Sequence, residues 1–149
     1  MSPELTINPR LAQFAVQLAG RVLSWFAILQ GSFIIFGGLD RWSSPSFAAA
    51  LLLPGSPPSW GIILVILGLS ALVGSHMARL RPVIFGMFGG AAWCAFFAMA
   101  FGVTAMQNSL ASTTGVWAYG LIGTLYGLIG LTYRQSRKLR KSALHRDHS

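Results

Sequence analysis

Few side chains in this sequence could take part in chemistry, and they lie far apart. The carboxylates are Glu4, Asp40 and Asp147. Cys94 is the only cysteine, so it cannot form a disulfide within the chain, and in an apolar run it is expected to fill space. His145, Asp147 and His148 could touch a metal ion, but three groups on a polar terminal segment rarely make a site. We therefore expect no catalytic residue, no metal site, no cofactor and no enzyme.

The elements that must position any site are four uncharged apolar runs, at residues 22–39, 60–78, 83–106 and 116–133. Of the 149 residues, 54% are hydrophobic and 9% are charged, and the mean hydropathy is +0.61. Each run is near the ~20 residues that a helix needs to cross ~30 Å of hydrocarbon. Helices pair their backbone groups internally, as the bilayer requires. The sequence predicts an all-α integral membrane four-helix bundle.

A cleaved secretory signal is the alternative for the first run, because Arg10 and Arg21 precede it and alanines fill positions 48–50. Residues 22–39 exceed the ~7–15 residues of a signal's apolar core, and the alanines lie well beyond the end of the run. We therefore expect a retained span.

Basic residues gather on one side of the predicted bundle. Of the 11 Lys and Arg residues, all but Arg41 fall on the side that holds both termini, and Arg41 follows Asp40. Because short loops rich in Lys and Arg stay in the cytosol, we expect a multi-pass membrane protein with both termini cytoplasmic. The residues expected to set topology and contact lipid headgroups are Arg21, Arg79, Arg81, Arg134, Arg137, Lys138, Arg140 and Lys141.

The predicted organisation is a cytoplasmic segment at residues 1–21, a four-span domain at 22–133 and a basic cytoplasmic tail at 134–149. Clustered Arg and Lys can bind nucleic acid, but a basic segment directly after a span is typical of contact with anionic headgroups. We therefore expect the bilayer and its anionic lipids as partners of the tail, and no nucleic acid.

The connection between the first two runs, residues 41–60, is unusually apolar for a loop. Ser44 and Pro45 are suited to start a short helix, and Pro54 with Gly55 to end it. So short a helix cannot cross a membrane, and we expect it to lie in the interface or to fold back between the spans. It would serve as a hydrophobic lid, or as a re-entrant, oligomerising or partner-binding element. The residues of this outer interfacial segment are Trp42, Pro45, Phe47, Pro54 and Trp60.

Small residues recur along one face of every run. In the last run, Gly120, Gly123, Gly127 and Gly130 are three and four positions apart, which places them on one face of a helix. The other stripes are Gly20, Ser24, Ala27 and Gly31; Gly61, Gly68, Ala71 and Ser75; and Ala91, Ala95, Ala98 and Gly102. Small residues let helices approach closely in a bilayer. These faces could meet within one bundle or between copies in a homo-oligomer, and the sequence allows both.

The whole chain resembles the small four-span membrane proteins of phages that infect actinobacteria. The outer connection GGLDRWSSPSFAAALLLPGSPPSWG, residues 37–61, carries most of the similarity. Some of these proteins are called holins or are encoded beside lysis enzymes, so the resemblance implies a setting in host lysis. It assigns no role to any single residue.

We therefore expect a non-enzymatic, phage-type inner-membrane protein that acts by assembly in the bilayer, with a holin-like or lysis-associated role. One alternative is a membrane interaction protein, for superinfection exclusion or envelope scaffolding, that uses residues 41–60. Another is a DoxX-like or transporter-like small membrane protein with an internal pocket. The lack of carboxylates within the runs weighs against this last alternative.

Overall fold

The computed structural model describes residues 9–37, 42, 47, 51–52, 56–108 and 113–146, with the backbone alone for 9, 10 and 140–146. Within these residues the chain forms four long helices and no strand: α1 (Pro9–Phe36), α3 (Pro58–His76), α4 (Leu80–Gln107) and α5 (Thr114–Arg146). Each helix is long and apolar enough to cross a membrane. The predicted all-helical class with four candidate spans is confirmed for this part of the chain. Most of the short helix predicted from Pro45 to Pro54 lies outside the described residues.

Two of the helices are longer than the apolar runs that predicted them. α1 begins at Pro9 rather than near residue 22, and α5 ends at Arg146 rather than near residue 133. Charged side chains interrupt an apolar run without ending a helix, because Arg21 and Arg134 are exposed and leave the backbone bonds intact. At 1.5 Å per residue, α3 is about 28 Å long, whereas α1 reaches about 42 Å and α5 about 50 Å. Segments 9–21 and 134–146 therefore continue helices.

A tight turn joins α3 to α4. The Met77 N–H donates to the Val73 carbonyl and the Arg79 N–H to the Gly74 carbonyl, both at 2.9 Å. Ala78 lies between them with a φ of 52°, a left-handed conformation that favours glycine. Chain reversal in so few residues places the start of α4 directly beside the end of α3.

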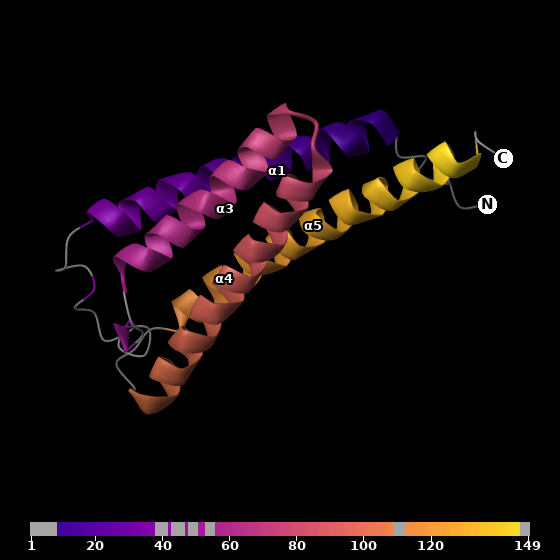
Figure 1. Cartoon of the computed structure of the whole chain (residues 1–149). Coiled ribbons are helices and arrows are strands. Elements are labelled where there is room, and N and C mark those ends of the chain that lie inside the picture. The colour runs from indigo at the N-terminus through magenta and orange to yellow at the C-terminus, as the bar shows by residue number, and fades with distance from the viewer. Residues whose placement is uncertain are drawn as a thin grey trace, which may run out of the picture.

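The helices pack in chain order, α1 against α3, α3 against α4 and α4 against α5, while α1 meets α5 only over a short stretch (Figure 1). The start of α1, the α3–α4 turn and the end of α5 lie at the same end of the molecule. We call this the basic end, because its described charged residues are Arg21, Arg79, Arg81, Arg134, Arg137 and Lys138. The opposite end is called the aromatic end.

Backbone-close contacts hold the first pair of helices together. A Cβ atom added to Gly31 would lie 2.6 Å from the Gly61 carbonyl oxygen, and one added to Gly61 would lie 2.5 Å from the Gly31 carbonyl oxygen. Nearer the basic end of the same interface, a Cβ on Gly68 would lie 2.8 Å from the Ser24 carbonyl oxygen. Part of the predicted stripes of the first two spans thus packs together within one chain, whereas Gly20 faces Tyr133 of α5 and Ala71 faces Gly86 of α4.

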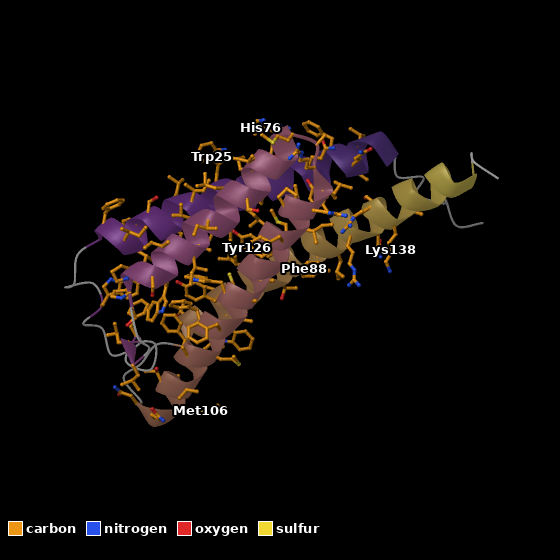
Figure 2. The ribbon with its side chains drawn as sticks, in the orientation of Figure 1. Trp25, His76, Phe88, Met106, Tyr126 and Lys138 are labelled. Carbon is orange, nitrogen blue, oxygen red and sulfur yellow. The ribbon has the colours of Figure 1, made fainter. Side chains whose placement is uncertain are left out.

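Aromatic rings fill the aromatic end, between the diverging ends of α3 and α4 (Figure 2). Phe97 of α4 is 1% exposed and lies at the centre, with ring centroids 4.2 Å from Trp93 and 5.1 Å from Trp60 of α3. Tyr119 of α5 packs on Phe101 at 5.5 Å. Offset and edge-to-face pairs of this kind add to the packing energy of the core, each by about 0.5–1.5 kcal/mol.

Candidate functional site

The four glycines of the α5 face divide into two pairs. A Cβ on Gly123 would lie 3.0 Å from Cys94 Cβ, and one on Gly130 would lie 3.3 Å from Met87 Cβ, so these two glycines face α4. At Gly120 and Gly127 the same atom would meet nothing within 4 Å among the described residues. The reason is geometric: steps of three and four residues spread the glycines over an arc of the helix. One edge of that arc packs on α4 and the other edge stays uncovered.

The uncovered edge borders a groove between α4 and α5 with a volume of about 410 Å³. Its lining residues are Ala91, Ala95, Ala98, Tyr119, Gly120, Gly123 and Thr124. Most of these side chains are small, and Thr124 satisfies its hydroxyl by donating to the Gly120 carbonyl at 2.8 Å. Both helices are candidate spans along this stretch. We call this feature the α4–α5 groove.

The α4–α5 groove contrasts with the rest of the lateral surface, which exposes large apolar side chains. Leu29, Phe85 and Leu121 are each at least 60% exposed. Bulky side chains of this kind are ordinary contacts for lipid tails, whereas a surface of small residues lets another helix approach its backbone. The groove can therefore support helix packing.

The basic residues predicted to set topology come together at the basic end, although they are far apart in sequence. Arg21 borders a small pocket with Gly74, Ser75 and Tyr133, so it lies level with the end of α3. Lys138, labelled in Figure 2, lies on the extension of α5. Arg140 and Lys141 belong to the same helix, and their side chains lie outside the described part.

The outer interfacial segment is fixed to the bundle by its aromatic residues. Trp42 contacts Phe47 and Trp60 edge to face, at centroid distances of 4.8 and 6.0 Å, and Phe47 contacts Phe101 at 5.1 Å. Trp60 is 6% exposed and belongs to the core rather than to the lipid-facing surface. Pro45 and Pro54 lie outside the described residues. The described aromatic side chains therefore turn inward and pack over the aromatic end.

Groups able to do chemistry are few in the described part. Cys94 is 1% exposed, and no cluster of His, Cys, Asp or Glu in the ranges described could hold a metal ion. All three carboxylates fall outside those ranges. The Trp93 indole N–H is buried without a hydrogen-bond partner.

Sequence reasoning missed the contact that joins the first helix to the last. The Tyr126 hydroxyl donates to the Leu23 carbonyl at 2.6 Å, and the Tyr126 side chain is 2% exposed. A signal was present: Tyr119, Tyr126 and Tyr133 recur every seven residues, which places them on one stripe of α5. This stripe faces the inside of the bundle next to the glycines.

Fold and groove together define an all-helical protein with four candidate membrane spans and a groove of small residues on α4 and α5. No family model matches the chain, and comparisons with curated proteins and with solved structures found no match. The resemblance to phage membrane proteins stays a prediction.

Proposed function

We propose that this chain is a non-enzymatic membrane protein that acts by assembling with copies of itself in the bilayer, in a holin-like or lysis-associated role. The observation that carries the proposal is the α4–α5 groove, which Gly120 lines. Gly120 and Gly127, on the same uncovered edge of α5, both have open space in front of them among the described residues. Gly31 and Gly61, by contrast, have their open sides filled by a neighbouring helix of the same chain. A second copy would fill the α4–α5 groove in the same way.

Assembly through the groove would be self-complementary, because copies related by a two-fold axis would present the same small-residue surface to each other. Within lipid, burial from water supplies no driving force, so contact between the copies would rely on close packing of their helices. The lysis-associated role rests on the predicted bacterial inner-membrane setting and on the resemblance to phage proteins.

The first test compares substitutions of equal size on two faces of α5. Gly127→Leu adds bulk to the uncovered edge of α5 that borders the groove, and Ala118→Leu adds bulk nine residues away, which is half a turn round the helix from Gly127. Each variant is expressed inducibly in bacteria while membrane potential and culture density are followed. We expect abrupt depolarisation with the wild-type chain and with Ala118→Leu, and none with Gly127→Leu at equal membrane expression.

Cross-linking tests assembly without relying on toxicity. In a Cys94→Ala background, which keeps the Cβ that faces Gly123, Ala98→Cys should form disulfide-linked dimers on oxidation and Ala118→Cys should not. Equal cross-linking at both positions, or depolarisation that persists with Gly127→Leu, would contradict assembly through the groove.

A second candidate function is interaction with another envelope protein through the outer segment. It is favoured by the exposure of Leu52 (86%), Met106 (89%) and Trp117 (76%) at the aromatic end. Replacing Leu52, Met106 and Trp117 with Ser distinguishes the candidates. The interaction function requires the phenotype to vanish while Ala98→Cys cross-linking persists, and the assembly function requires both to persist.

A further inference from the structure

A cavity of about 380 Å³ lies between α1 and α5 at the basic end, with Leu80 at the start of α4 as its floor. A smaller pocket of about 110 Å³ adjoins it, and both are lined by Gln17, Leu80 and Tyr133. The larger cavity falls in the size range of small-molecule sites. The residues that matter for recognition are Gln13, Gln17, Arg21, Thr132, Tyr133 and Ser136.

The cavity exists because α1 and α5 touch at one crossing and then separate. At the crossing, Tyr133 lies against Gly20, where an added Cβ would be 3.2 Å from the tyrosine hydroxyl, and Tyr126 bonds to Leu23. Beyond it both helices continue past the α3–α4 turn, which closes one side through Leu80.

Hydrogen-bond donors with no partner in the described part of the chain line this space. Thr132 and Ser136 donate to carbonyls of their own helix, at 3.0 Å each. Gln13, Gln17 and Arg21 make no hydrogen bond or ion pair with a described side chain or backbone group. All three side chains are exposed, so two carboxamides and a guanidinium are accessible to a ligand.

The electrostatics of the cavity select an anion. Every ionisable side chain on α1, α5 and the α3–α4 turn within the described residues is basic or tyrosine, and the carboxylates lie outside them. Arg21 adjoins the cavity, while Arg137 and Lys138 are placed on the α5 segment that walls it. The planar guanidinium of arginine matches the oxygens of a phosphate group, and charge-assisted hydrogen bonds of this kind are the strong ones.

The position of the cavity, opposite the apolar side of α1, indicates the source of the anion. On the side of α1 opposite the cavity, Leu11, Phe14 and Leu18 are 66%, 62% and 51% exposed. Those apolar side chains place this part of α1 at the membrane interface, where phospholipid headgroups lie. We propose that the cavity between α1 and α5, together with the adjoining pocket, binds the phosphate headgroup of an anionic phospholipid, with Gln13 and Gln17 of the cavity and Arg21 of the adjoining pocket as its ligands. The proposal does not depend on the proposed assembly.

The test measures lipid binding to the full chain in neutral detergent by native mass spectrometry, with phosphatidylglycerol and phosphatidylcholine as probes. We expect at least ~10-fold tighter binding of phosphatidylglycerol, which Arg21→Gln reduces by ~10-fold or more because it removes a charged donor. Arg134→Gln is the matched control for charge, because Arg134 and Arg21 are both exposed and both predicted to contact headgroups, and it removes the same charge at the same end of the molecule. Arg134 lines neither the cavity nor the adjoining pocket, so its replacement should reduce phosphatidylglycerol binding clearly less than Arg21→Gln does.

Gln17→Leu provides a second variant that leaves the charge unchanged and should also lower phosphatidylglycerol affinity, while circular dichroism verifies that each variant is folded. Equal binding of the two lipids, or equal losses in Arg21→Gln and Arg134→Gln, would overturn the proposal. Competition by glycerol 3-phosphate as strong as that by phosphatidylglycerol would assign the cavity to a soluble phosphate ester and overturn the lipid assignment.

Discussion

Gly61→Ala is the substitution whose effect on stability can be worked out most directly. The new Cβ would lie 2.5 Å from the Gly31 carbonyl oxygen and 2.7 Å from Ile35 Cγ1. Ordinary contact begins near 3.4 Å, so α1 and α3 must move apart by about 0.9 Å at this point. A backbone carbonyl cannot rotate away as a side chain can, so the whole interface moves.

Overpacking of this kind costs about 1–3 kcal/mol, and the helix preference of alanine over glycine recovers up to about 1 kcal/mol. Because the contact is with a backbone carbonyl, we take a cost of about 2–3 kcal/mol, in the upper part of this range, and expect Gly61→Ala to lower the free energy of unfolding by about 1–2 kcal/mol. The assay is unfolding in mixed micelles of rising dodecyl sulfate content, at protein dilutions that keep copies apart. Tryptophan fluorescence follows the loss of the core, because Trp60 beside the site and Trp93 are both buried.

Gly102→Ala is the matched control, since its Cβ meets no described atom within 4 Å, and it should be neutral or stabilising. Adding Gly31→Ala to Gly61→Ala should cost less than the sum of the single changes, because one displacement relieves both contacts. If Gly61→Ala proved as stable as Gly102→Ala, the close approach of α1 and α3 at this point would be refuted.

The remaining predictions concern single residues, and the first two use the same unfolding assay. Tyr126→Phe should lower the free energy of unfolding by about 0.5–1.5 kcal/mol, because it removes the hydrogen bond to the Leu23 carbonyl, and an unchanged value would contradict that bond. Ala78→Gly should raise it by about 0.5–1 kcal/mol, since glycine adopts a φ of 52° without the steric cost that alanine bears. Phe47→Ala should expose the aromatic end and increase quenching of Trp60 fluorescence by acrylamide, whereas Leu52→Ala, at an exposed position, should not.

The span count and much of the small-residue packing follow from the sequence because hydropathy and helical spacing are local properties. Pro58, two residues before the predicted start of the second run, begins α3, as expected for a residue that favours the first turn of a helix. α1 begins at Pro9, before the predicted apolar run at residues 22–39, because Arg21 ends an uncharged run without ending a helix. Hydropathy registers the charge, whereas helix continuity depends on the backbone.

The candidate site was only partly predictable for a different reason. Spacing indicates that Gly123 and Gly127 share a face of α5, but it does not indicate how far round that face α4 extends. The lateral position of a neighbouring helix depends on tertiary packing, here on Cys94 and Met87 of α4. Likewise, the cavity at the basic end depends on where α1 and α5 separate, which no periodicity in either helix encodes.

The single hydrogen bond between Tyr126 and Leu23 has a consequence for the order in which the protein is made. Its partners are 103 positions apart, whereas α1 with α3 and α4 with α5 are neighbours along the chain. Synthesis delivers the first hairpin complete, with Gly31 already against Gly61, before α5 has left the ribosome. Contacts of long sequence separation form late. Membrane insertion should therefore proceed hairpin by hairpin, and the Tyr126 bridge should close the bundle as the final step of biogenesis.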